Sequence, residues 1–414
     1  MPVIYFGLSI IVFFIVYNKV QKDVLHPVAI LSFMWFFTAA VASLQWGVYQ
    51  REWEISVHAM ILIAGLCCFG CGLVKIRSRK YAILAASPIS NTYCLITRIV
   101  FFICLFLVIY FFYQNGMSFN AISNVDGPDI KNEIAENMSG ISSLESYIMN
   151  LFPSCALYSF FEMLYGEPGN KNIKFNIFVI CVVVYYCSNM ILSRGTLLYI
   201  LLGGLFIYNS KNKISIKMLV CSMISVCVIL GVLMIFRLSS GSVVFLGVEN
   251  IENPILASAY NYLAYSFENF NFIVERGSRY QIFSNVLQSG YKLIGIYDSE
   301  QVVSNDIGAF NSLTWLAPFY DDLGLLGVIM YPSIIGLLLS IWYEKSLLDK
   351  SYVLLLAVLQ KAIFIPFFGN YFFTSFSLMF PYLVTGLICY MSKKMYLRYN
   401  MPRIKFSNIR IKWR

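Results

Sequence analysis

Long apolar segments separated by short polar ones dominate the pattern of this chain. A helix that crosses a bilayer needs roughly 20 mostly apolar residues. Eleven segments, bounded by charged, Gly, Pro or Asn residues, fit such helices: 2–18, 27–46, 57–75, 94–114, 146–165, 174–192, 195–209, 217–236, 323–343, 352–368 and 373–392. The pattern therefore predicts an all-α polytopic membrane protein with about 11 transmembrane helices.

The composition supports this class. Hydrophobic residues make up 59% of the chain and charged residues only 12%, whereas a soluble domain carries roughly a quarter charged residues. These values exclude a soluble enzyme, a secreted disulfide scaffold and a disordered chain. No basic residue precedes the first apolar segment and no small-residue cleavage site follows it, so we expect it to stay as a helix.

The distribution of basic residues predicts the orientation. Short loops rich in Lys and Arg stay in the cytoplasm. With the N-terminus outside, 22 of the 30 Lys and Arg residues lie on the inner side, seven lie outside and Lys361 lies within a span. We therefore expect an outer N-terminus and a cytoplasmic C-terminus. The basic tail at 393–414 suits anionic inner-leaflet lipid better than nucleic acid.

Two outer loops are long in this orientation. Residues 1–236 carry the first eight spans and an outer loop at 115–145, which is a mobile flap or a solvated connector. Residues 237–322 form a loop too long to lack structure, so we expect a folded cap, with an interfacial helix at 255–275. Residues 323–392 carry the last three spans. The many aromatic residues of the cap, Trp315 and Tyr320 among them, are either a belt at the headgroup level or a sugar-stacking surface.

The sequence predicts neither a metal nor a cofactor. All 11 cysteines lie in or beside predicted spans, where a thiol behaves as a small apolar group. Cys67, Cys68 and Cys71 have a spacing that can bind metal, but no second Cys pair or His cluster accompanies them. Zinc-hydrolase, phosphate-loop and Gly-x-Ser-x-Gly motifs are absent from the sequence.

Several basic residues are candidates for binding an anion. Arg194 lies in a tight turn between two apolar spans, where a guanidinium is costly unless it pairs with an acid, binds a diphosphate or reaches the headgroups. Lys361, inside a span, either serves function or pairs with an acid from another span. Arg276 and Arg279 follow Glu268 and Glu275 and are either ligand-binding or part of a surface ion-pair cluster.

Candidate proton acceptors also lie on the predicted outer side. Asp321 and Asp322 precede the ninth span. Adjacent carboxylates repel, so one can retain its proton and act as an acid or base. Alternatively, both simply favour the positive N-terminal end of a helix. His58 lies near the outer end of the third span, where a structural role is the alternative.

Two segments resemble the Wzy-type O-antigen polymerases, also called oligosaccharide repeat unit polymerases. They are NSLTWLAPFYDDLGLLG at 311–327, which leads into a span containing Gly336, and SRGTLLY at 193–199. The span count and the single large outer loop are similar to that family. The resemblance implies a GT-C-like glycosyltransferase of the bacterial inner membrane that needs no metal.

The resemblance implies that two undecaprenyl-diphosphate-linked glycans meet on the periplasmic face, where the growing chain is transferred to a new repeat unit. Departure of the diphosphate needs cations, and the acceptor hydroxyl needs a base. The candidate cations are Arg194, Arg237, Arg276, Arg279 and Lys361, the candidate bases are His58, Glu268, Asp321 and Asp322, and Asn311, Trp315 and Tyr320 are candidate substrate contacts.

Two alternatives share parts of this pattern. An O-antigen ligase would have the same topology and arginines. A lipid-linked oligosaccharide flippase or other transporter would also have many spans, but such proteins usually have short outer loops and internal repeats, which we do not find in this sequence. The expected partners are the lipid-linked oligosaccharides and the bilayer, with a chain-length regulator protein as a further candidate and nucleic acid excluded.

Overall fold

The structure is a computed structural model. It describes residues 1–20, 22–75, 91–114, 143–166, 172–187, 194–224, 248, 251–280, 285, 312–372 and 376–400. Within these ranges the chain is helical, with turns and irregular connections and no β-strand, which confirms the all-α prediction for this part of the chain. In the part of the chain that the structure describes, four helices are long and apolar enough to cross a membrane: Pro2–Lys19, Ile55–Val74, Asn91–Phe111 and Leu325–Ser346. The total of eleven spans stays a prediction.

The apolar segments coincide with helices. Their bounds are α1 Pro2–Lys19, α2 Pro27–Ala42, α3 Ile55–Lys75, α4 Asn91–Gln114, α6 Ser143–Leu151, α7 Ser154–Tyr165, α8 Ile173–Tyr185, α9 Arg194–Lys211, α14 Leu325–Ser346, α15 Lys350–Phe364 and α16 Phe376–Asn400. Residues 216–224 are also helical. The segment 146–165 differs from the prediction, because a turn at Phe152 and Pro153 divides it into α6 and α7.

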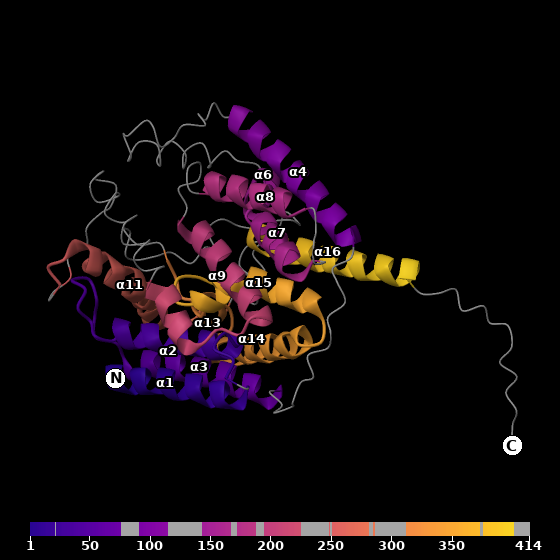
Figure 1. Cartoon of the computed structure of the whole chain (residues 1–414). Helices are drawn as coiled ribbons and strands as arrows, with labels where there is room; N and C mark the ends of the chain where they lie inside the picture. The colour runs from indigo at the N-terminus through magenta and orange to yellow at the C-terminus, as the bar shows by residue number, and fades with distance from the viewer. Residues whose placement is uncertain are drawn as a thin grey trace, which may run out of the picture.

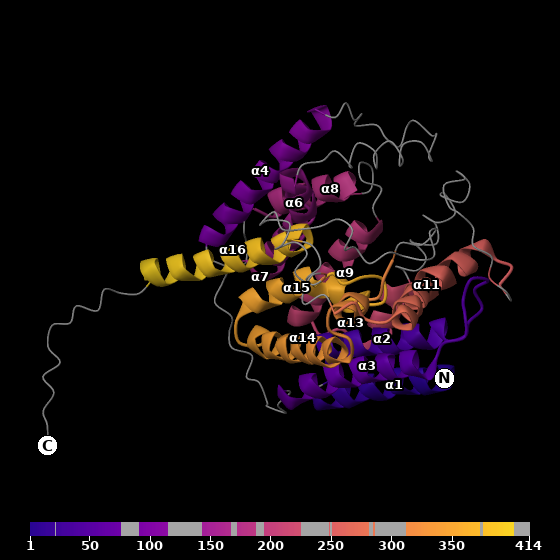
Figure 2. The same cartoon turned by 180° about the vertical axis from the view of Figure 1, so that it is seen from behind.

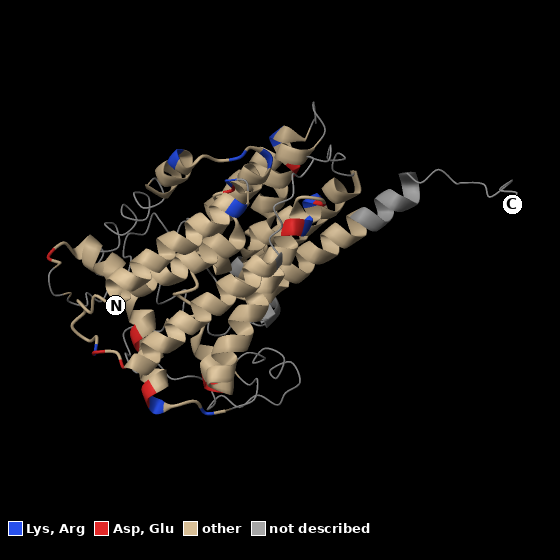
Figure 3. Cartoon of the chain, turned by 90° about the horizontal axis from the view of Figure 1, so that it is seen from below, with Lys and Arg blue, Asp and Glu red and all other residues tan. Residues whose placement is uncertain are grey.

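The helices form two groups joined by α9 and α15. In both views α1, α2, α3 and α14 lie together on one side, and α4, α6, α7 and α8 lie on the other (Figures 1 and 2). α15 contacts α2 and α14 in the first group and α7, α9 and α16 toward the second, so most of its side chains are buried. Most charged residues lie near helix ends, and long stretches of the helices carry none (Figure 3).

Glycines allow the closest approach between helices. α14 packs most extensively against α3, and a Cβ atom on Gly336 would lie only 2.0 Å from the carbonyl oxygen of Cys68. A Cβ atom on Gly203 of α9 would lie 2.8 Å from the carbonyl oxygen of Ala357 of α15. Small residues at helix contacts are typical of membrane bundles, because packing rather than water exclusion holds the helices together.

Two further helices belong to the predicted cap. α11 (Pro254–Arg276) confirms the helix expected at 255–275, and it begins where the Asn253 side chain accepts hydrogen bonds from the backbone N–H groups of Ile255 and Leu256. Most of α11 is buried, and it packs chiefly against α2. α13 (Ala317–Leu323) is short and ends at Gly324, whose φ of +56° suits a residue without a side chain.

Candidate functional site

Asp321 joins α13 to the end of α11. The Arg276 Nη2 atom donates to Asp321 Oδ1 at 2.9 Å, and Arg279 Nε donates to Oδ1 and Oδ2 at 3.1 and 2.9 Å. Arg279 Nη2 contacts Oδ2 as well. The Asp321 side chain is fully buried, while the arginine side chains are 29% and 24% exposed. Of the two alternatives for Arg276 and Arg279, the structure shows the ion-pair cluster, with the buried carboxylate of Asp321 as a partner.

Asp322 lies in the same cluster. The side-chain nitrogen of Asn285 lies 2.8 Å from both Asp321 Oδ2 and Asp322 Oδ1, and the backbone N–H of Asn285 also donates to Asp322 at 3.0 Å. These four charged groups, two guanidiniums and two carboxylates, sum to zero. Among the described residues, these four groups therefore give no excess positive charge with which to attract a diphosphate.

The two aspartates are the fifth and sixth residues of the seven-residue α13 and precede the long helix α14. That they favour the positive end of α14 stays a prediction. Two further hydrogen bonds reinforce the contact: the Tyr280 backbone N–H and the Ser278 side-chain hydroxyl donate to the carbonyl oxygen of Asp321 at 3.1 and 3.0 Å. Asp321 thus holds the end of α11 against α13.

Glu268 holds α11 against the connection between α2 and α3. Its oxygens accept hydrogen bonds from the backbone N–H of Arg51 at 3.2 Å and from Trp53 Nε1 at 2.9 Å. Burial raises the pKa of the Glu268 carboxyl above its ordinary value, and the hydrogen bonds from Trp53 and Arg51 counteract this in part. Glu275 forms an ion pair with Arg51 at 3.6 Å.

His58 and Glu268 both neighbour Trp53. Its Nδ1 atom lies 3.0 Å from the Tyr5 hydroxyl, and its ring is 5.4 Å from the ring of Trp53, which donates to Glu268. Two of the predicted bases therefore share Trp53 as a neighbour. Both are engaged in contacts between helices.

The predicted aromatic contacts are buried. Trp315 is 1% exposed and packs against Trp35 and Phe372, at ring distances of 5.8 and 6.1 Å. Tyr320 is 8% exposed and meets Phe270 edge-on at 6.0 Å. These rings are packed into the protein core, and their faces are not open to a sugar.

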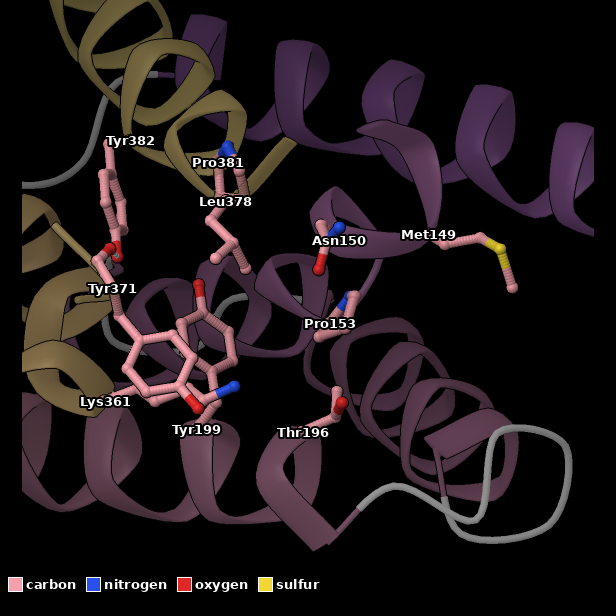
Figure 4. A pocket seen from close by; sticks show the side chains of 10 residues that line it. All are labelled: Met149, Asn150, Pro153, Thr196, Tyr199, Lys361, Tyr371, Leu378, Pro381 and Tyr382. Carbon is pink, nitrogen blue, oxygen red and sulfur yellow. Dashed lines mark hydrogen bonds between the residues drawn. The ribbon is translucent and has the colours of Figure 1, made fainter. Parts of the chain in front are cut away.

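Lys361 has a different setting, in a pocket near the ends of several helices. The pocket has a cavity volume of about 50 Å³, is open to its surroundings and is lined by Met149, Asn150, Pro153, Thr196, Tyr199, Lys361, Tyr371, Leu378, Pro381 and Tyr382 (Figure 4). The Nζ atom of Lys361 lies 4.3 Å from the centroid of the Tyr371 ring. Among the residues that the structure describes, no carboxylate lies within ion-pair distance of Nζ.

The polar groups around Lys361 are neutral. The Tyr199 hydroxyl lies 2.7 Å from the Ser154 hydroxyl, and the Tyr382 hydroxyl donates to the carbonyl oxygen of Tyr371 at 3.0 Å. Among the described residues that line the pocket, Lys361 is thus the one with a charged side chain. An ammonium with only neutral neighbours can bind an anion without first losing a carboxylate partner.

Local sequence explains how this pocket is lined. Pro153 lacks a backbone N–H and lies in the turn that separates α6 from α7. Pro381 lies inside α16 near its start and likewise cannot donate a backbone hydrogen bond within the helix. Thr196 and Tyr199 belong to the SRGTLLY segment, so this segment lines the pocket. Neither residue was among the predicted site residues.

The remaining predicted residues lie wholly or partly outside the described part of the chain. Arg237 and Asn311 lie outside the described residues, as do most of the 115–145 loop and the tail beyond residue 400. Arg194 begins α9, but its side chain is outside the described part. Thr196, two residues further on, lines the Lys361 pocket.

The chain was also compared with known proteins. No family model, no curated protein and no solved structure matches it.

Proposed function

We propose that the chain is a surface-polysaccharide (O-antigen) polymerase of the bacterial inner membrane. It would be a glycosyltransferase that joins undecaprenyl-diphosphate-linked repeat units on the periplasmic face. The observation that carries the proposal is the pocket of Lys361. Its ammonium group faces the ring of Tyr371, and among the described residues no carboxylate lies within ion-pair distance of it. Such a group suits a phosphate that is joined to an apolar tail, because it lies in an otherwise apolar helical bundle.

The chemistry requires a cation at one position. The acceptor hydroxyl of a new repeat unit attacks C1 of the first sugar of the growing chain, a glycosidic bond forms, and the bond from C1 to the diphosphate oxygen breaks. The hydroxyl proton passes to solvent or to the departing diphosphate. Negative charge develops on the departing diphosphate, and a fixed ammonium group stabilises it. We assign this role to Lys361. The four predicted bases do not line the pocket, so we assign none of them to the acceptor hydroxyl.

The depth of the pocket favours a headgroup ligand. At roughly 1.5 Å per helical residue, Lys361 lies about 5 Å along the axis from the end of α15, and Thr196 lies about 3 Å from the start of α9. In the predicted orientation both are outer ends. A lipid-linked diphosphate lies at this level of a bilayer.

A lipid-linked oligosaccharide flippase or transporter is the second candidate. The interrupted helix at Pro153 and the proline inside α16 favour it, because transporter sites are often built where helices are broken. Those sites lie near the bilayer midplane, however, whereas this pocket lies within about one turn of the ends of α9 and α15. The ligase that transfers finished O-antigen to lipid A core uses the same donor chemistry. It is distinguished from a polymerase by its product.

A gel that resolves surface polysaccharide by chain length tests the proposal. Cells lacking the gene would receive wild-type, Lys361→Met or Lys350→Met protein at matched membrane levels. Lys350 is the control because it starts the same helix and lies 4.8 Å from the ring of Tyr165, at the opposite end.

We expect the deletion to leave core carrying a single repeat unit and no ladder. Wild-type and Lys350→Met protein should restore the ladder, and Lys361→Met should not. Loss of even the single unit on deletion would favour the ligase or the flippase. A full ladder with Lys361→Met would contradict the assigned role of Lys361.

A further inference from the structure

The connection from α15 to α16 brings Tyr371 over Lys361. The described part of this connection, residues 365–372, leaves α15 just after Phe364. It returns the Tyr371 ring to within 4.3 Å of the Lys361 Nζ atom, three residues before that helix end (Figure 4). A phosphate that approaches Lys361 would therefore meet this ring.

A side chain of α16 holds the Tyr371 end of the connection. The Tyr382 hydroxyl donates a hydrogen bond of 3.0 Å to the carbonyl oxygen of Tyr371. Tyr382 also lines the pocket, six residues into α16. Because the bond is to the backbone carbonyl of Tyr371, it fixes the backbone position from which the Tyr371 side chain extends, and not only the rotation of the ring.

The predicted cap holds the other end. The backbone N–H of Trp315 donates to the carbonyl oxygen of Pro366 at 2.8 Å, and the Trp315 ring packs 6.1 Å from that of Phe372. The segment that carries Trp315 is itself attached to α11, because Asn269 Nδ2 donates to the carbonyl oxygen of Ser312 at 2.8 Å. The connection is thus held between α16 and the cap.

We propose that Tyr382 is a positioning residue for the Lys361 site. Its hydroxyl holds the 365–372 connection so that the Tyr371 ring covers the ammonium group until a phosphate ester displaces the ring. Attraction between an ammonium and an aromatic face keeps the ring in place. A phosphate offers a stronger, charge-assisted contact and replaces it. The inference rests on the proposed function for the identity of the anion.

Chemical labelling of lysines tests the position directly. The full chain in lipid nanodiscs would be treated briefly with acetic anhydride, and acetylation of Lys361 and Lys350 would be measured by mass spectrometry. The variants are Tyr382→Phe, Tyr371→Leu and the matched control Tyr165→Phe, which removes a hydroxyl bonded to Ser210 beside the Lys350 ring contact.

We expect Tyr382→Phe and Tyr371→Leu to increase acetylation of Lys361 relative to Lys350. For Tyr382→Phe we expect about fivefold, the factor that corresponds to the ~1 kcal/mol of one net hydrogen bond. Tyr165→Phe should leave Lys361 unchanged. Unchanged Lys361 acetylation in Tyr382→Phe would overturn the proposal, and so would an equal rise at both lysines, which reports general opening.

Inorganic diphosphate separates this inference from the proposed function. In the wild-type protein it should protect Lys361 from acetylation and leave Lys350 unaffected. Absence of protection, together with the expected rise in Tyr382→Phe, would count against the anion role of Lys361 and leave the positioning role of Tyr382 supported.

Discussion

Arg279 and Asp321, 42 residues apart in sequence, face each other with Nε of the guanidinium within 3.1 Å of both carboxylate oxygens. Arg276 reaches the same carboxylate from the end of α11. A buried carboxylate shared by two arginines fixes the end of α11 against α13, immediately before α14 begins. These contacts support the ion-pair alternative for the two arginines, in which they stabilise the cap.

Replacing Asp321 should destabilise the protein. Asp321→Asn leaves two guanidiniums without their carboxylate, and we expect the free energy of unfolding to fall by about 2–3 kcal/mol, less than for a fully buried pair because both arginines are partly exposed. Denaturant unfolding in detergent measures this. Glu275→Gln is the control, because its partner Arg51 is 63% exposed and the pair should contribute less than ~1 kcal/mol. Equal losses in the two variants would refute the structural role of Asp321.

Close packing of α14 on α3 should make Gly336 intolerant of a side chain. In Gly336→Ala the added Cβ would meet the Cys68 carbonyl oxygen at 2.0 Å, so the helices must separate. We expect a loss of roughly 1–3 kcal/mol or more, seen as a lower thermal midpoint and yield. Gly386→Ala in α16 meets nothing within 4 Å and should be neutral or slightly stabilising. A stable Gly336→Ala protein would mean that α3 and α14 do not pack this closely.

Glu268 should make stability depend on pH. Burial raises its pKa in the folded protein above the ordinary value of 4.5, so the folded state binds the proton more tightly than the unfolded state. This contribution to stability is fully present below the unfolded pKa and is lost as pH rises through the folded pKa.

Glu268→Gln removes this titration. Thermal midpoints of wild-type and variant protein, measured from pH 4 to 7.5, should therefore shift in favour of the variant as pH rises. A difference between the two proteins that stays constant over this range would show that Glu268 does not titrate with a raised pKa.

Loss of the Lys361 charge should slow transfer rather than unfold the protein. Lys361→Met keeps the length and apolar stem of the side chain. We expect the initial rate of polymerisation by purified protein with lipid-linked repeat units to fall roughly 100-fold, the size seen when one group that stabilises developing negative charge is removed. Lys361→Arg, which keeps the charge, should restore part of the rate. A normal rate in Lys361→Met with an unchanged thermal midpoint would show that the charge is not used.

The path of most apolar segments could be predicted from the sequence. Helix α1 was expected at residues 2–18 and is found at Pro2–Lys19, and α4 was expected at 94–114 and is found at Asn91–Gln114. In the segment 146–165 the local signal was present and was missed, because Pro153 marks the division between α6 and α7.

The candidate site could be predicted only in part. Lys361 was identified because a charge inside an apolar segment is costly anywhere in the chain. Its neighbour Tyr371 could not be identified, since nothing in the local pattern distinguishes this tyrosine from the other 28. The carboxylate that binds Arg276 and Arg279 could not be identified from the sequence, because Asp321 lies 45 and 42 residues further along the chain.

The sequence by itself determined the membrane class, the helices and the residues with costly charges. These follow from local properties, since a backbone in lipid must satisfy its own hydrogen bonds within each apolar segment. Only the tertiary structure decided which charges are compensated. Helix packing brings Asp321 to both arginines and leaves Lys361 with a tyrosine ring, and such partners depend on contacts between segments that lie far apart in the chain.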